Sequence, residues 1–213
     1  MNKEDKKILF FSLVLAIVLF SFGFLLGNYV ASLRLEEFKK SEEKLFYNII
    51  GLEVREAILN DICQINDDDL WKEKVELGIM LTALERKKGK ENEEVLRIKE
   101  IYEIIEIKLI LLLEEIKKKC NENFDIILFF YSNKQNASLS EDQGRILDTI
   151  AYEHNEKKKG NPVYIFAFSL ESENPASRFL RAKYGIKQAP SIVINDIVLE
   201  GYKEKKSITD LIK

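Results

Sequence analysis

The pattern of apolar and polar positions divides the chain into three regions, and the first is an uncharged apolar run. Residues Ile8 to Gly27 read ILFFSLVLAIVLFSFGFLLG and carry no charge. About 20 residues at ~1.5 Å rise match the ~30 Å hydrocarbon core of a bilayer. We therefore predict one transmembrane helix in residues 1–32, in contact with membrane lipid through Ile8 to Gly27.

A cleaved signal peptide is the alternative interpretation of this run. The run is longer than the apolar core of a usual signal peptide, and the following Tyr29-Val-Ala-Ser-Leu is a poor cleavage site. We expect a retained anchor. Lys3, Lys6 and Lys7 precede the run, which favours a cytoplasmic N-terminus and an extracytoplasmic C-terminal body in a single-pass protein of the cell membrane.

Helical periodicity fills the second region, residues 33–120. A first helix is expected from Leu33 to about Cys63, a second begins at Asp67, and a third runs from Glu91 to Lys119. Because each has an apolar stripe, the pattern predicts an antiparallel helical stalk or bundle. Alternatively, the stripe from Leu35 to Leu59 forms a coiled coil in a homodimer, although Glu42 and Glu56 lie on that stripe.

Strands and helices alternate in the third region, residues 123–213. Asp125–Tyr131 and Val163–Phe168 are apolar enough to be buried strands, and a short hairpin follows with its turn at Asn195-Asp196. Helices are expected from Ser138, where Ser-Leu-Ser-Glu has capping-box form, from Asn174 and from Ser207. The region is therefore α/β.

This order, together with Ala189-Pro190 at the mouth of the strand Ser191–Asn195, resembles the second half of a thioredoxin-like domain. The resemblance implies a cis bond before Pro190, next to the start of the helix that follows the first strand. It also implies a Cys-x-x-Cys pair near Ala137 and Ser140, but this chain has no cysteine there. The predicted fold is an α/β thioredoxin-like C-terminal domain, preceded by one transmembrane helix and an antiparallel α-helical stalk, and we expect it to be redox-inactive.

In that superfamily the proline loop forms a shallow groove for extended peptide. The residues expected to line the groove here are Asn136, Ser138, Ser140, Ala189, Pro190 and Ser191. A strand edge can bind a peptide through backbone hydrogen bonds without any chemistry. The leading hypothesis is thus a protein-interaction or adaptor module that binds an extended peptide or a membrane-complex subunit.

The two cysteines support the alternative, a thiol-disulfide oxidoreductase. The predicted topology brings Cys63 and Cys120 to the membrane-distal end of the helices, where they could form a disulfide. If they form no disulfide, Cys63 and Cys120 are two unrelated small core residues.

Composition narrows the classes of function that remain. The 33 basic and 36 acidic residues alternate along the chain, so no basic face for nucleic acid stands out. His154 is the one histidine and lies at a polar helix end, so we expect no catalytic residue, no metal site and no cofactor.

The anchor hypothesis predicts that the full chain stays in membranes after carbonate extraction, because a 20-residue apolar helix partitions stably into the bilayer. Its intact mass should still include Met1–Gly27. Release of a shortened, soluble protein would instead identify a cleaved signal.

Overall fold

The computed structural model describes residues 11–30, 62–64 and 67–212, together with the single positions 7, 40, 43, 47 and 51. The chain divides into two compact units, Met1–Lys44 and Leu45–Lys213. In the first unit, Phe11–Val30 is a helix of 20 residues with a mean hydropathy of 2.2. It is the one helix in the described ranges that is long and apolar enough to cross a membrane, and a signal sequence shares these properties.

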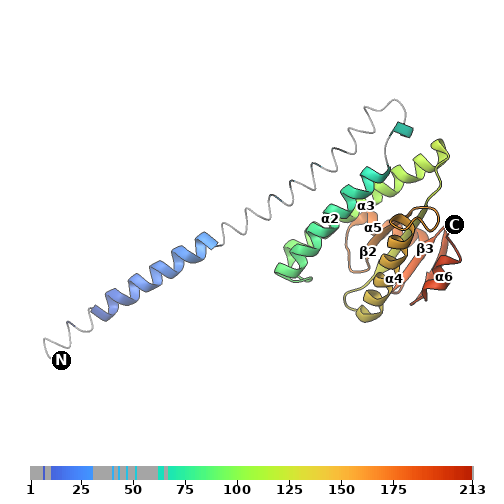
Figure 1. Ribbon diagram of the computed structural model, residues 1–213. Coiled ribbons are helices and arrows are strands. Elements are labelled where there is room, and N and C mark those ends of the chain that lie inside the picture. The colour runs from blue at the N-terminus through green and yellow to red at the C-terminus, as the bar shows by residue number, and fades with distance from the viewer. Residues whose placement is uncertain are drawn as a thin grey trace. The chain divides into compact units, whose positions relative to one another are not determined.

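The second unit begins with helices (Figure 1). The short 3-10 helix η1 spans Ile62–Gln64, and α2 (Asp67–Lys88) and α3 (Glu93–Cys120) pack against each other. Asn92 caps α3 by accepting a hydrogen bond from the backbone N–H of Glu94, and Asn121 ends it with a left-handed φ of 55°. These bounds confirm the second and third predicted helices within two residues. The first predicted helix, Leu33 to Cys63, and the coiled-coil stripe lie mostly outside the described residues.

A four-stranded sheet follows, with the order β2-β1-β3-β4. Strand β1 (Asp125–Tyr131) is parallel to β2 (Val163–Ser169) and antiparallel to β3 (Ser191–Ile194), which pairs with β4 (Ile197–Glu200). The helices α4 (Ala137–Asn155), α5 (Pro175–Tyr184) and α6 (Lys205–Thr209) connect or follow the strands. The mixed α/β class predicted from the sequence is therefore correct.

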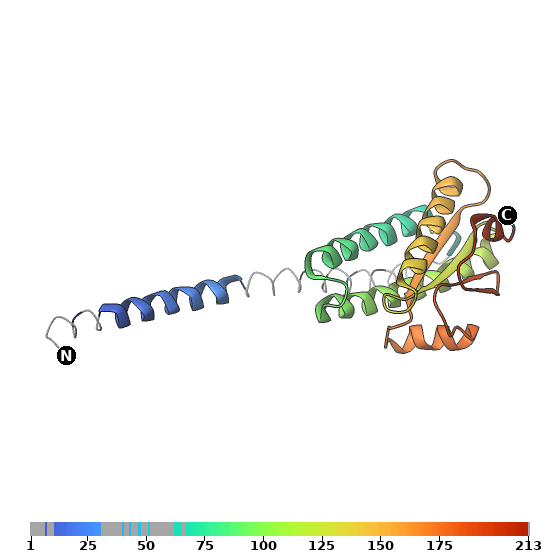
Figure 2. The same cartoon turned by 90° about the horizontal axis from the view of Figure 1, so that it is seen from below.

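Side chains alternate between the two faces of this sheet, and each face is covered by helices (Figures 1 and 2). Ile127, Phe129 and Ile165 belong to one core cluster, which α4 and α6 complete with Leu147, Ile150 and Ile208. On the other face Phe130 and Phe168 stack with ring centroids 5.6 Å apart, and α3 contacts both β2 and α5. Strands β1, β2 and β3 are thus mostly buried, whereas β4 is exposed or half-buried.

Helix α3 also covers the outer edge of β2, the strand at one end of the sheet. The backbone N–H groups of Ala167 and Ser169 donate to the carboxylates of Glu106 (3.2 Å) and Glu103 (2.9 Å). From α2, Lys74 Nζ donates to the carbonyl of Ile165 at 2.6 Å. These side chains occupy the positions that a further strand would fill.

The predicted division into a helical stalk (33–120) and an α/β domain (123–213) stays a prediction. In the structure, helices α2 and α3 belong to the same compact unit as the sheet, Leu45–Lys213. The sequence pattern showed that α3 needed a partner for its apolar face. It did not show that the partner was a sheet, because an apolar stripe packs equally well on helices or strands.

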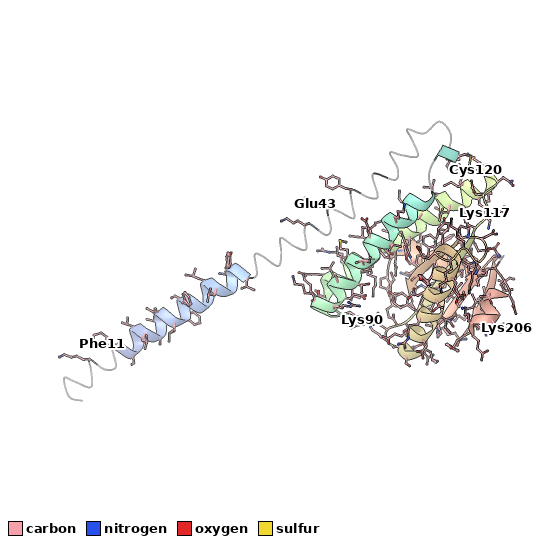
Figure 3. All side chains as sticks on the ribbon, in the orientation of Figure 1. Phe11, Glu43, Lys90, Lys117, Cys120 and Lys206 are labelled. Atoms are coloured by element: carbon pink, nitrogen blue, oxygen red, sulfur yellow. A yellow bond between two sulfur atoms is a disulfide. The ribbon has the colours of Figure 1, made fainter. Side chains whose placement is uncertain are left out.

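A disulfide joins Cys63 in η1 to Cys120 at the end of α3, with Cα atoms 5.4 Å apart. It closes a loop that contains all of α2 and most of α3, with a sequence separation of 57 residues. In Figure 3 Cys120 and Lys90 mark opposite ends of the α2–α3 hairpin. The hairpin is therefore closed covalently at one end and by the Gly89–Asn92 turn at the other.

Replacing both cysteines, as Cys63→Ala with Cys120→Ala, should lower the free energy of unfolding by about 2–4 kcal/mol, because the unfolded chain regains the entropy of the open loop. Urea titration of the oxidised chain and of the double variant measures the difference. Equal midpoints for the two proteins would contradict a stabilising disulfide.

Candidate functional site

A cavity of about 430 Å³ lies between α2 and α4 at the carboxyl end of β1. Phe129 and Tyr131 of β1 and Tyr102 of α3 line its aromatic part, and Ala167 contributes from β2. All of these residues belong to the second compact unit. Cavities at the carboxyl ends of strands are frequent ligand sites in α/β proteins, so this cavity is the candidate functional site.

Small residues on the two helices leave this space open. Gly78 and Thr82 face it from α2, and Ala137, Ser140 and Gly144 face it from α4. A Cβ atom added at Gly144 would lie 3.7 Å from Cε1 of Phe129, so any longer side chain there would enter the cavity. The space between the two helices is thus open because these positions carry no large side chains.

Three ion pairs surround the cavity, each between a lining lysine and a lining glutamate. Lys99 Nζ lies 2.7 Å from Glu85, Lys74 Nζ lies 3.3 Å from Glu106, and Lys90 Nζ lies 3.2 Å from Glu141. The first two pairs are largely buried, whereas the third is exposed and contributes little to stability. The lining lysines are therefore already neutralised by the protein itself.

The buried glutamates of α3 have perturbed acidities. Burial raises the pKa of Glu106 to about 7, although the nearby Lys74 ammonium and the Ala167 N–H favour its charged form. Burial also raises the pKa of Glu103, against the hydrogen bonds from Ser177 and Ser169. Glu106 lines the cavity, so a group that titrates near neutral pH lies at the candidate site.

Hydrogen bonds hold the loop between β1 and α4 in one conformation. Ser132 donates to the carboxylate of Glu171 and accepts from the N–H groups of Lys134 and Gln135 at 3.0 and 2.8 Å. Burial acts to raise the pKa of Glu171, but the hydrogen bonds from Ser132, Ser169 and the Asn133 N–H outweigh it and lower that pKa. Ser132 therefore fixes the loop to Glu171.

The two predicted helix-capping serines have other roles. Helix α4 begins one residue earlier than predicted, at Ala137, and its N-cap Asn136 has a left-handed φ of 54° with no side-chain cap. Ser138 is therefore inside the helix and exposed. Ser140 is 4% exposed, and its Oγ accepts the N–H of Ser132 at 3.2 Å, so it fastens the loop to the helix.

The predicted groove is only partly assembled. The Ala189–Pro190 bond is cis, as predicted, and Asn136 Nδ2 lies 3.2 Å from the Ala189 carbonyl oxygen, so the proline loop does adjoin the start of α4. However, Ala189, Pro190 and Ser191 are buried. Ser191 donates to the carbonyl of Gln188, and Asn136 already occupies the Ala189 carbonyl. These polar groups of the proline loop are therefore hydrogen bonded within the protein.

Sequence reasoning missed the cavity itself, although it identified two of its residues, Ala137 and Ser140. It treated Glu103 and Glu106 only as interruptions of an apolar helix. Their spacing of three residues inside that apolar run was the signal that both point to one face, into the protein. His154, expected on the surface, is half-buried with Nδ1 2.9 Å from the Asn161 carbonyl oxygen.

No protein-family model matches the chain, and a search of curated proteins found no match. Within the described ranges, no three His, Cys, Asp or Glu side chains come together as a metal site would require. The candidate site therefore rests on the geometry of this molecule.

The variant Glu106→Gln should flatten the dependence of stability on pH. Because the folded pKa of about 7 lies above the ordinary 4.5, the folded state binds the extra proton and loses stability as the pH rises from 4.5 to above 7. That loss is on the order of 3 kcal/mol. Glutamine keeps an oxygen to accept the Ala167 N–H but does not titrate.

The measurement is urea unfolding at several pH values between 4.5 and 8. Glu115→Gln, the same chemical change on the outer part of α3, is the matched control. If Glu106→Gln retained the full wild-type slope, Glu106 would not be the titrating group.

Proposed function

We propose that this chain is a single-pass, membrane-anchored binding protein with a redox-inactive thioredoxin-like body, and that the α2–α4 cavity receives part of a partner protein. The observation that carries this proposal is the position of the cavity. It opens at the start of α4, where thioredoxin-like proteins have their thiols, and it is lined there by Ala137 and Ser140. Binding without thiol chemistry is the function that such a site supports.

Two features support the thioredoxin-like assignment. The βαβ unit of β1, α4 and β2 is followed by α5 and by the ββα unit of β3, β4 and α6, with the strand order β2-β1-β3-β4. The cis bond at Ala189–Pro190 adjoins the start of α4 through Asn136.

The cysteines favour a structural role over the alternative thiol-disulfide oxidoreductase. Among the described residues no free cysteine is present. Cys120 lies before the start of β1 and the α4 loop lies after its end, so the two are separated by a seven-residue strand, roughly 20 Å at ~3.3 Å per residue. A substrate bound at the proline loop would not reach the disulfide.

The disulfide also supports the orientation that the sequence predicts. Disulfides persist in oxidising compartments and are rare in the cytoplasm. An anchor at Phe11–Val30 with the body outside the cytoplasm would place Cys63 and Cys120 in such a compartment. The apolar helix would then serve as a signal-anchor.

Site-specific photo-crosslinking in the native membrane tests the proposal. A photoreactive residue in place of Thr82, at the exposed mouth of the cavity, should give a discrete cross-linked protein. The same residue in place of Arg86, one turn further along α2 and outside the cavity lining, is the matched control and should not.

The variant Gly144→Leu should abolish the cross-link from Thr82, because the added side chain fills the space in front of Phe129. Circular dichroism of this variant should show that it remains folded. A cross-link that is as strong from Arg86, or that survives Gly144→Leu, would contradict binding in the cavity.

A further inference from the structure

The two edges of the sheet differ in how their backbone groups are satisfied. On the β2 edge, side chains of the helices bond outward N–H and C=O groups of the strand. On the β4 edge, no hydrogen bond reaches the outward backbone groups from any part of the chain that the structure describes. The sheet therefore has one protected edge and one open edge, that of β4.

The hairpin turn identifies the outward groups of β4. Both residues of the Asn195-Asp196 turn have positive φ, 50° and 66°, as in a two-residue type I′ turn. In such a hairpin the flanking pair, Ile194 and Ile197, is hydrogen bonded, and bonded and non-bonded pairs then alternate along the strands. Val198 and Glu200 therefore direct their N–H and C=O groups away from β3.

The side chains of β4 favour a further strand at this edge. The strand reads Ile-Val-Leu-Glu and lacks the lysine or proline that often protects an edge. Ile197 is 47% exposed and Leu199 is half-buried, and both lie on the sheet face that α4 and α6 cover. The charged Glu200 lies on the opposite face, where Gln188 bonds it at 3.1 Å. An added strand would therefore bury apolar side chains as well as satisfy the backbone.

A second, antiparallel copy of β4 fits the open edge in one register. When Val198 of one copy lies opposite Glu200 of the other, every outward group of both strands has a partner. Leu199 then faces Leu199 of the other copy across a two-fold axis. The neighbouring registers place Glu200 opposite a second Glu200 or opposite Asp196, and like charges directly opposite each other are destabilising. The edge is thus complementary to itself.

Membrane anchoring favours such pairing between copies. Strand β4 has only four residues, and a short isolated strand pair is at best marginally stable in water. The anchor proposed above confines the copies to one plane, which raises their effective concentration. A weak edge contact is therefore sufficient in the membrane.

We infer that a second copy of this chain pairs with the open edge, so that the β4 strands join two four-stranded sheets into one continuous sheet. This inference goes beyond the proposed function, because β4 does not line the α2–α4 cavity, and it shares only the anchor with that proposal.

Disulfide cross-linking of the full chain in proteoliposomes tests the pairing. The two native cysteines are bridged to each other, so an added cysteine is the one free thiol. Leu199→Cys should form a covalent dimer on oxidation with copper phenanthroline. Facing residues of a non-hydrogen-bonded pair have Cα atoms about 4.5 Å apart, which is within the reach of a disulfide.

Ile197→Cys is the matched control for chance collisions. This position is exposed and lies on the same face as Leu199. In the inferred register, however, the two copies of residue 197 are offset by four residues, about 13 Å at ~3.3 Å per residue. Ile197→Cys should therefore give only the collisional background of dimer.

Two variants at Val198, each combined with Leu199→Cys, test the contact itself. Val198→Pro removes an N–H that points away from β3, so the hairpin keeps its own hydrogen bonds while the open edge loses a donor. Val198→Glu keeps the backbone but places a like charge opposite Glu200 of the other copy. Both should reduce the cross-link to the Ile197→Cys background, whereas Val198→Thr should leave it unchanged. Circular dichroism and urea midpoints check that the variants remain folded.

Equal dimer yields from Ile197→Cys and Leu199→Cys, or a Leu199→Cys dimer that survives Val198→Glu, would overturn the inference. In native membranes, a discrete adduct of Leu199→Cys with another protein and no homodimer would show that the edge binds a partner strand, and would overturn it as well. The Thr82 cross-link does not involve β4, so the proposed function stands or fails separately.

Release of the chain on carbonate extraction would remove the anchor from both proposals.

Discussion

The outer edge of β2 is the constraint on which the arrangement of this protein depends. An edge strand exposes a row of N–H and C=O groups, and leaving such groups buried without partners costs about 1–3 kcal/mol each. Here Glu103, Glu106 and Lys74 satisfy the edge from the α2–α3 hairpin, and Asn155 of α4 bonds both the N–H and the C=O of Val163. Side chains of the helices thus make the hydrogen bonds that a fifth strand would make with β2.

This solution accounts for the buried charges of α3. Two carboxylates in an apolar core are costly unless they are hydrogen bonded and paired. Glu103 receives the Ser169 N–H and the Ser177 hydroxyl, and Glu106 receives the Ala167 N–H beside the Lys74 ammonium. The raised pKa of each carboxyl reflects the burial that remains uncompensated. The hairpin is thereby fixed to the sheet at one register.

The cavity is a consequence of the same attachment. Because α3 covers the β2 edge, α2 lies beside α4 on one face of the sheet, and the missing side chain at Gly144 leaves the space in front of Phe129 open. The disulfide and the Gly89–Asn92 turn hold the two ends of α2, whose buried apolar residues in the described part are Leu77 and Leu81. Fixing both ends of α2 thus compensates for the small apolar area that this helix buries beside an open cavity.

Hydrophobic period, caps and turn residues act locally, so the sequence predicted the apolar N-terminal run, α2, α3 and the four strands. The cis bond before Pro190 was implied only by the resemblance to thioredoxin-like domains. Only the tertiary structure decided that the hairpin joins the sheet, that Glu103 and Glu106 hold the β2 edge, and that Asp148 shares a cavity with Lys74. These contacts join residues 61 to 91 positions apart, and periodicity carries no information about which surfaces meet over such distances.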